Sequence, residues 1–305
     1  SGLDPFWSRL ITTTDRDGVE RTWHVLDNRV EHPELTLLCV HGNPTWSYLW
    51  RKLIIHAPAG IRVVAPDHLD MGYSDRTGTL RRLRQRIDDL DSVTRALGIT
   101  GPVVTVAHDW GGPISLGWAA THRQQLAGIV LMNTAVHQPA GSPAPTLIRM
   151  ARSKPVLDSL TVRTSGFVSG TLRLAKNRLP KPVRNAFHSP YRSATRRRAI
   201  GEFVADIPLE ADHPSRAALD EIIESLDHMN EVPALLLWGP ADPVFSDLYL
   251  HDLQTRLPQA RVHRYPKASH LLPEDVAIAG PIYEWLAALD TGAVTGRKSA
   301  TRDDI

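Results

Sequence analysis

Cysteine is almost absent from this chain, which holds a single thiol, Cys39, in 305 residues. One thiol excludes an intrachain disulfide framework, and its position in the apolar run TLLCV indicates a buried, unreactive side chain. Long apolar runs are missing as well, since none approaches the roughly 20 residues that a membrane-spanning helix needs. The N-terminus also lacks the basic and then apolar layout of a signal peptide. These absences predict a soluble protein of a reducing compartment, the cytoplasm.

Charge of one sign is not in excess either. The chain has 35 Lys and Arg against 33 Asp and Glu. A net charge of +2, as a whole-chain figure, gives no reason to expect nucleic acid or a membrane as partner. The 305 residues suit one large domain with an insertion, or two small domains. Metal-ligand spacing is absent among the histidines, so no metal or other cofactor is predicted; those considered are His68, His122, His137, His188 and His228.

Short apolar runs alternate with helical patterns after an N-terminal hairpin whose turn holds Asp17 and Gly18. The runs cover residues 36–40, 61–66, 103–107, 128–133, 234–239 and 261–265. Continuous apolar strands separated by helices are typical of a parallel sheet covered on both faces. The predicted fold class is therefore α/β.

The best-defined helix lies between the second and third runs. Its apolar residues recur at spacings of three and four and share one stripe: Leu80, Leu83, Ile87, Leu90, Val93 and Leu97. Gly98 then takes a C-cap position. The charged residues off this stripe are predicted to form a solvated face; they are Arg81, Arg84, Asp88, Asp91 and Arg95.

The alternation of strand and helix stops between the fourth and fifth runs. Residues 137–225 have helical patterns and several prolines but no run typical of a buried strand. We therefore predict a helical cap there, over the C-terminal edge of the sheet, with residues 1–136 and 226–290 forming the α/β core. Residues 291–305 lack apolar periodicity, which predicts a disordered tail or a linker.

Basic residues are concentrated in the predicted cap. Between Ile148 and Ile200, Asp158 is the single acid among many Arg and Lys residues. Two interpretations stand: a solvated surface, and a docking face for an acidic partner or anionic lipid.

The stretch VAHDWGGPISLG, Val106 to Gly117, has the strand, tight turn and helix of a nucleophile elbow, where an α/β-hydrolase normally carries serine. Here the tip of the turn is Asp109. Small residues two positions away on either side, Ala107 and Gly111, leave that turn uncrowded. The N-terminus of the following helix would favour an ionised carboxylate at this position.

Two further signals fall at the same edge of the sheet. His270 follows the last strand, in KASHLLPED, and Asp242 follows the strand before it, in LLLWGPADPVFSD. A catalytic histidine needs an acid that orients it and stabilises its charge. Asn133 has no charge to supply, and Asp247 lies further into the next segment. The order Asp109, Asp242, His270 is the nucleophile, acid and base order of this fold.

Each of these residues alone has a structural explanation. Asp109 could cap a helix, His270 could be an ordinary loop histidine, and Asp242 could belong to a turn, but their joint placement favours catalysis. A carboxylate nucleophile suits attack at an sp3 carbon and leaves an alkyl–enzyme ester. The departing group carries negative charge and needs hydrogen-bond donors. The indole N–H of Trp110 and the amide of Asn43 are the candidate donors.

The motifs HGNPTWSYLWR, HDWGGPIS, SPYRSATRRRAIGEF and ASHLLPED resemble those of the haloalkane dehalogenases, and the resemblance spans nearly the whole catalytic domain. It implies Asp109 as nucleophile, Trp110 and Asn43 as leaving-group donors, Asp242 as acid and His270 as base. Asn43 and Trp110 argue against the epoxide hydrolases, which use tyrosines of the cap.

Other stretches are more similar to one branch of that family, the β-lactone decarboxylases of bacterial long-chain olefin biosynthesis: RIDDLDSVTRALGITGPV, AHDWGGPISLGWA, VLMNTAVHQP, SPYRS, DIPL and LPQARVH. This similarity implies decarboxylation of a hydrophobic small molecule, a cis-β-lactone, to a cis-alkene and CO2. It also implies partners: the β-lactone synthetase, fused to the decarboxylase in some members, and other olefin-pathway enzymes. A linker to such a synthetase would suit residues 291–305.

The alternative function is hydrolysis of a carbon–halogen bond to an alcohol and halide. His270 would activate water in that reaction, whereas decarboxylation leaves its role open. One departure from the family is Asp70 in DHLDMG, where glycine is usual.

Overall fold

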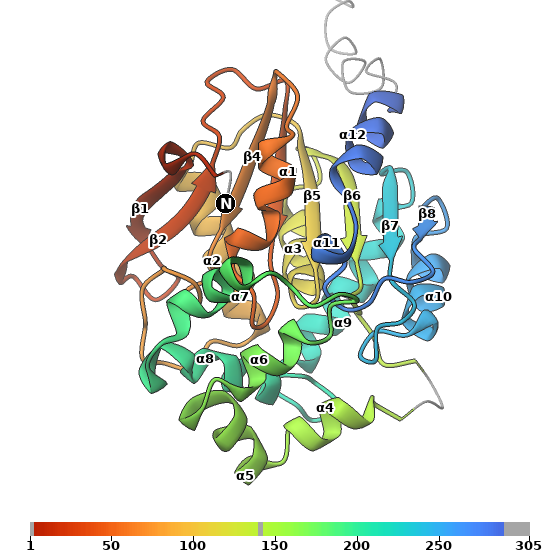
Figure 1. The fold of residues 1–305 in the computed structure, drawn as a ribbon. Helices are drawn as coiled ribbons and strands as arrows, with labels where there is room; N and C mark the ends of the chain where they lie inside the picture. Colours follow the sequence, from red (N-terminus) through yellow and green to blue (C-terminus); the bar gives the residue numbers. More distant parts are fainter. Residues whose placement is uncertain (1–2, 140–142, 290–305) are drawn as a thin grey trace, which may run out of the picture.

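Within residues 3–139 and 143–289, which the computed structural model describes, eight strands form one sheet (Figure 1). They are β1 (Ser8–Thr14), β2 (Glu20–Asp27), β3 (Leu35–Val40), β4 (Ile61–Pro66), β5 (Val103–His108), β6 (Leu126–Met132), β7 (Ala234–Trp238) and β8 (Arg261–Arg264). Their order is β1-β2-β4-β3-β5-β6-β7-β8. The pairs β1–β2 and β2–β4 are antiparallel, and the remaining pairs are parallel. The predicted α/β class is confirmed.

The middle strands are buried on both faces, as their continuous apolar sequences predict. Every residue of β5 is buried, and so is every residue of β7. β8 is different, because all four of its residues are exposed and it pairs with β7 alone. The run at 261–265 is therefore an edge strand rather than part of the buried sheet.

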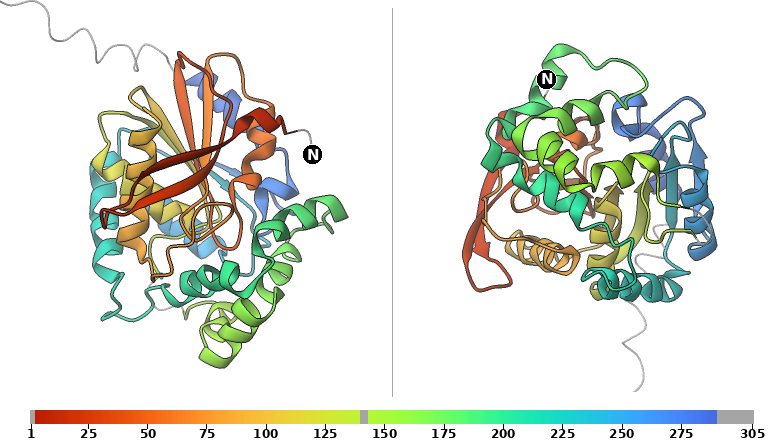
Figure 2. Two further views of the ribbon diagram at one scale, coloured as in Figure 1. Left: turned by 90° about the vertical axis from the view of Figure 1, so that its left-hand side faces the viewer. Right: turned by 90° about the horizontal axis from the view of Figure 1, so that it is seen from below.

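Helices cover both faces of the sheet (Figure 2). The core helices are α1 (Arg51–Ile55), α2 (Leu83–Ala96), α3 (Gly111–Thr121), α9 (Arg216–Leu226), α10 (Asp247–Arg256), α11 (Leu272–Asp275) and α12 (Ala279–Ala288). Helices α2, α3 and α9 contact one another on one face, and α1 and α12 lie on the other. None of the helices in the described part of the chain is long and apolar enough to cross a bilayer.

The helix predicted from Leu80 begins later, at Leu83. Leu80 is 41% exposed, so the apolar stripe starts one turn further along. Arg81 is 1% exposed, contrary to the predicted solvated face. Its guanidinium lies in the turn before α2 and donates to Asp89 at 2.9 Å and to Asp15 of the hairpin turn at 2.6 Å. The guanidinium of Arg81 is therefore buried because Asp15, which is distant in the sequence, pairs with it, although helical periodicity predicts that Arg81 faces solvent.

Short helices fill the segment between β6 and β7: α4 (Thr146–Ala151), α5 (Lys154–Leu157), α6 (Gly166–Leu172), α7 (Lys181–His188) and α8 (Ala194–Ala205). They lie together over one end of the core (Figure 2). Helix α9 falls within the predicted cap range 137–225 but packs against α3 and α2. We therefore propose that the core resumes before Arg216. The tail predicted at 291–305 lies outside the described residues.

Hydrogen bonds from the SPYRS motif, residues 189–193, and from the start of α8 join the cap to the core. The buried hydroxyl of Tyr191 donates to the Thr45 carbonyl at 3.0 Å and accepts the Gly72 N–H at 3.2 Å. Arg197 donates to the Tyr191 carbonyl at 2.9 Å, and Arg196 donates to the Gly72 carbonyl at the same distance. These two arginines are part of the cap's structure rather than of a solvated face.

Asp70 stands in the left-handed region, with φ 70°, which explains why glycine suits this position. Its carboxylate accepts the Thr77 N–H at 2.5 Å and the Thr77 hydroxyl at 2.7 Å. These bonds offset the backbone cost of a side chain there.

Replacing Arg81 with Met should destabilise the fold by about 3–5 kcal/mol, because the buried Asp89 loses the guanidinium that binds it and Asp15 keeps only its bond from Arg21. Urea unfolding followed by circular dichroism would measure the loss. The matched control is Arg95→Met on the exposed side of α2, where a change within about 0.5 kcal/mol is expected. Equal losses in the two variants would contradict a structural role for the buried cluster.

Candidate active site

Asp109 occupies the tip of the turn between β5 and α3. Its φ of 54° is unusual for a residue with a side chain. The turn is held by its own backbone: the Asp109 N–H donates to the Asn133 carbonyl at 3.2 Å, and the Asp109 carbonyl accepts the Thr134 hydroxyl at 2.6 Å. A Cβ on Gly111 would lie 2.0 Å from the Val40 carbonyl oxygen, so the turn packs tightly against the end of β3. The predicted elbow is therefore present.

The carboxylate of Asp109 is buried but surrounded by donors. Its Oδ1 accepts the Asn43 N–H at 2.8 Å. Burial raises the pKa of Asp109, while the charge of His270 and the backbone N–H groups of Trp110 and Asn43 act to lower it. The net direction of the pKa is upward, and the surrounding donors and the charge of His270 partly offset the effect of burial.

His270 and Asp242 meet as the sequence predicts. His270 Nδ1 lies 3.0 Å from Asp242 Oδ2. Burial alone would lower the pKa of His270, but the charge of Asp242, its hydrogen bond and the charge of Asp109 raise that pKa to about 9. The same pairing lowers the pKa of Asp242 despite its burial. At neutral pH the imidazole is therefore a cation beside two carboxylates.

Asn133 positions the carboxylate of Asp242 by a hydrogen bond, a role that the sequence analysis did not predict. Its amide nitrogen donates to Asp242 Oδ2 at 3.0 Å and to the Gly239 carbonyl at 2.9 Å, and its Oδ1 accepts the Gly239 N–H at 2.9 Å. The prediction set Asn133 aside because it has no charge. Its position at the end of β6, beside β7, was the signal that could have identified it. Asp247 instead pairs with Arg264 in an exposed ion pair.

The two candidate leaving-group donors differ in their surroundings. Trp110 lines the cavity, and its ring meets Phe203 edge-on at 5.6 Å. Asn43 uses its amide nitrogen to donate to the Ile200 carbonyl of α8 at 3.0 Å. A primary amide has two N–H groups, so one stays available to a ligand. Donation to a leaving group by either residue stays a prediction.

A buried ion pair joins two of the motifs. Arg51, from HGNPTWSYLWR, donates to Glu274, from ASHLLPED, through Nη2 and Oε2 at 2.7 Å. Both side chains are nearly inaccessible to solvent. This pair fixes the loop of Asn43 relative to the loop of His270.

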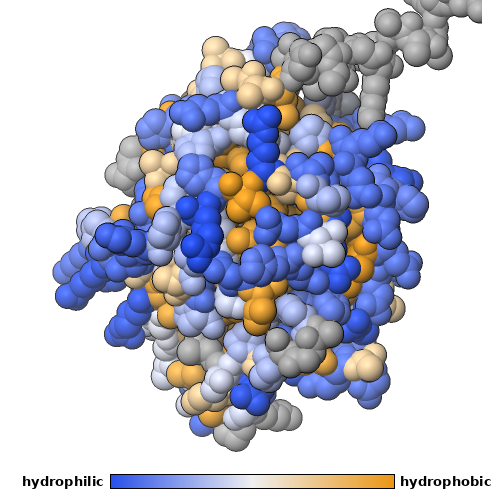
Figure 3. Space-filling model, turned by 90° about the vertical axis from the view of Figure 1, so that its right-hand side faces the viewer, coloured by the Kyte–Doolittle hydropathy of each residue, from blue (hydrophilic) through white to orange (hydrophobic). Residues whose placement is uncertain are grey.

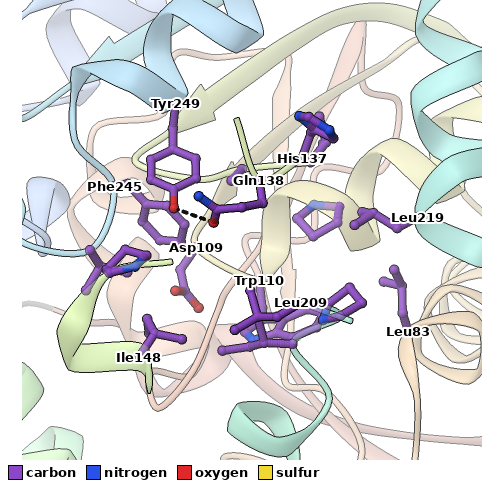
Figure 4. Close-up of a pocket in the computed structure, with 17 residues that line it drawn as sticks. Leu83, Asp109, Trp110, His137, Gln138, Ile148, Leu209, Leu219, Phe245 and Tyr249 are labelled. Atoms are coloured by element: carbon purple, nitrogen blue, oxygen red, sulfur yellow. Dashed lines mark hydrogen bonds between the residues drawn. The ribbon is translucent and has the colours of Figure 1, made fainter. Parts of the chain in front are cut away.

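A cavity of about 120 Å³ opens above Asp109 and Trp110 (Figure 4). Its wall is mostly apolar and comes from core and cap: Leu83, Pro113, Ala135, Val136, Pro145, Ile148, Ile207, Pro208, Leu209, Leu219, Val244 and Phe245. The polar side chains in it are His137 and a hydrogen-bonded pair, in which the Tyr249 hydroxyl donates to Gln138 Oε1 at 2.9 Å. Such a wall suits an apolar ligand that reacts at the Asp109 end.

Gly42 should tolerate no side chain. An added Cβ would lie 2.2 Å from Asp109 Oδ1, so Gly42→Ala must displace the nucleophile. A displacement of about 1 Å costs on the order of 100-fold in rate, and we expect at least that loss in kcat/KM. The control is Gly101→Ala, whose Cβ meets no atom within 4 Å. Full activity in Gly42→Ala would contradict the geometry described.

The imidazole of His270 should titrate near pH 9, and NMR of the ring protons would follow it. Because this pKa is raised on folding, the stabilisation is complete below the ordinary value of 6.5 and is lost as the pH rises through about 9. Asp242→Asn removes the main charge that raises the pKa, so both the titration and the loss of stability should move to lower pH. An unchanged titration in that variant would reject the pairing.

Known proteins that are similar to this chain belong to one fold family. Residues 36–276 match the model of the alpha/beta hydrolase fold family. The chain is 34% identical to a cis-3-alkyl-4-alkyloxetan-2-one decarboxylase of Xanthomonas campestris over 85% of this chain and 89% of that protein. It is 31% identical to the protein of the same name from Shewanella oneidensis, over 79% and 78% of the two chains. Identity to haloalkane dehalogenase 2 of Mycobacterium bovis is 30%, over 92% and 96%.

Solved structures share the fold. Haloalkane dehalogenase DbeA from Bradyrhizobium elkani superposes with a TM-score of 0.80 at 22% identity, covering 93% of this chain and 99% of that one. DatA from Agrobacterium tumefaciens gives the same TM-score at 18% identity, covering 92% and 97%. The elbow, the family match and these relatives together show that the chain belongs to the α/β-hydrolase family, in the group that holds the haloalkane dehalogenases and the cis-3-alkyl-4-alkyloxetan-2-one decarboxylases.

Proposed function

We propose that this chain converts a cis-β-lactone with two alkyl substituents into a cis-alkene and CO2 through an ester on Asp109. The observation that carries the proposal is a buried Asp109 carboxyl group at the end of an apolar cavity, where the Asn43 N–H and the charge of His270 favour its ionised form against the effect of burial. An oxetan-2-one is a β-lactone, and the relatives that bear this substrate name are 34% and 31% identical to the chain.

In the first step a carboxylate oxygen of Asp109 attacks the β-carbon of the lactone. The new carbon–oxygen bond forms with inversion as the ring carbon–oxygen bond breaks, and its electron pair stays on the departing carboxylate. That carboxylate remains attached through the α-carbon and lies beside the donors Trp110 and Asn43. Strain in the four-membered ring favours this opening.

In the second step the α-carbon loses CO2. The electron pair of the broken carbon–carbon bond forms the alkene, and the ester bond to Asp109 breaks on the opposite face. Inversion followed by this anti elimination gives the cis alkene. The carboxylate of Asp109 returns with both electrons of the ester bond, so the cycle consumes no water.

A cationic His270 suits this order of reaction steps. Asp109 is the leaving group of the second step, and an adjacent imidazolium stabilises the charge that returns to it. A hydrolase needs the opposite state, because only a neutral imidazole can take a proton from water. We therefore assign His270 the role of an electrostatic partner of Asp109 rather than that of a base.

Haloalkane hydrolysis is the second candidate, and one observation favours it. Trp110 lines the cavity together with Asp109, and a halide departing from Asp109 would accept the indole N–H there. Relatives named haloalkane dehalogenase 2 are 30% identical over most of both chains. In this reaction, alkylation of Asp109 would remove one of the charges that raise the pKa of His270, which favours loss of its proton to water, while Asp242 stays paired with the ring.

Purified protein should release alkene and CO2 from a long-chain cis-β-lactone and no bromide from 1,2-dibromoethane, as measured by gas chromatography and ion chromatography. Asp109→Asn should abolish alkene formation, since an amide cannot replace the carboxylate as nucleophile. Asp247→Asn is the matched control and should retain activity. Bromide release without alkene formation would reject decarboxylation in favour of the alternative.

His270→Gln distinguishes the two mechanisms. Loss of the imidazolium should slow alkene formation by about 100-fold while turnover continues, because no water is needed. A dehalogenase would stop after one turnover with an alkyl ester on Asp109, visible as added mass in the intact protein. Accumulation of such an ester from the lactone would contradict the proposed second step.

A further inference from the structure

The charge of this protein is strongly divided between two parts. Residues 148–200 contain 13 Arg and Lys and a single acid, Asp158, a net charge of +12. The whole chain carries +2, so subtracting +12 leaves −10 for the remainder. The near-neutral total therefore conceals a basic cap on an acidic core, and the field of this arrangement turns the cap toward negative surfaces.

Some of these basic side chains are committed to structure. Arg196 and Arg197 donate to backbone carbonyls, Arg152 pairs with Glu210, and Arg184 donates to the Leu179 carbonyl. Others are exposed, and no salt bridge joins them to an acid in the described part of the chain: Arg149, Arg163, Arg173, Arg178, Lys181 and Arg192. The exposed set is therefore available to an anionic partner.

Apolar side chains are exposed on the same segment. Met150 on α4 is 62% exposed, Val156 on α5 is 37% exposed, and Leu160 in the π-helical turn that follows is 39% exposed. Val156 and Leu160 are four residues apart, in two helical elements that follow one another directly. In Figure 3 the lower end of the molecule, where Figure 1 shows α4 and α5, has apolar side chains beside strongly hydrophilic ones.

Helix α4 connects this surface to the cavity. Ile148 lines the cavity, whereas Met150, two residues further on, is exposed on the outer side. Residues two apart on a helix point in nearly opposite directions. An apolar molecule that reaches the outer surface is thus separated from the cavity by the thickness of one short helix.

We propose that the outer face of α4, α5 and the following turn, with Met150, Val156 and Leu160 among exposed arginines, binds the surface of an anionic lipid bilayer. Interfacial membrane binding has two contributions. Cationic side chains are attracted to the lipid phosphates, and apolar side chains enter the boundary between the headgroups and the acyl chains. An acidic protein would match the cations and leave the apolar side chains uncovered. Binding in this way places the cavity next to the acyl region of the bilayer, in which molecules with long alkyl chains dissolve.

Co-sedimentation of the full chain with vesicles tests the proposal. We expect binding to vesicles of phosphatidylcholine mixed with phosphatidylglycerol, little binding to phosphatidylcholine alone, and a decrease as salt is added. Each cation contributes about fivefold to such binding, so Arg149→Glu with Arg163→Glu should weaken it at least about 25-fold. Met150→Ser with Leu160→Ser should weaken it about tenfold at constant charge.

The matched control reverses two exposed arginines of the core, Arg95→Glu with Arg261→Glu, and should leave vesicle binding unchanged. Equal binding to both lipid mixtures, or equal loss in the cap and core variants, would overturn the proposal. So would an absence of binding, as expected if the face receives an acidic protein instead. The assay needs no turnover, so its failure and a failure of the proposed decarboxylation are observed separately.

Discussion

Asp109 is a buried carboxyl group, and the need to offset the cost of ionising it is the constraint on which the rest of this structure depends. Burial raises the pKa of Asp109, and a neutral carboxyl is a poor nucleophile. The fold opposes this with the Asn43 N–H from the end of β3 and the charge of His270 from the loop after β8. Three separate strand ends must therefore converge around this carboxyl group, which a parallel sheet provides at one edge.

That convergence has its own supports. Gly42 has no side chain because Asp109 occupies the space where a Cβ would lie. Asn133 fixes Asp242, and the ion pair of Arg51 with Glu274 fixes the two loops that approach Asp109 from either side. These supports explain why the motifs extend well beyond the residues that would contact a substrate.

The sequence was sufficient for the parts of the fold that depend on local pattern. Apolar runs predicted the parallel strands, and the order of Asp109, Asp242 and His270 predicted the residues that meet at the site. Contacts between segments that are distant in the chain could not be predicted from the sequence. Arg81 is buried because the hairpin turn brings Asp15 to it, and Arg197 is buried because backbone carbonyls of the cap surround its guanidinium. No periodicity within a helix contains that information, and the same holds for the support that Asn133 gives to Asp242.

Asn43 bonds to the core and to the cap at once. Its backbone N–H donates to Asp109, while its side chain donates to the Ile200 carbonyl on the cap helix α8. Any displacement of α8 would therefore act on the residue that hydrogen-bonds to the Asp109 carboxyl group. The position of the cap and the hydrogen bonding of Asp109 are linked through this one residue.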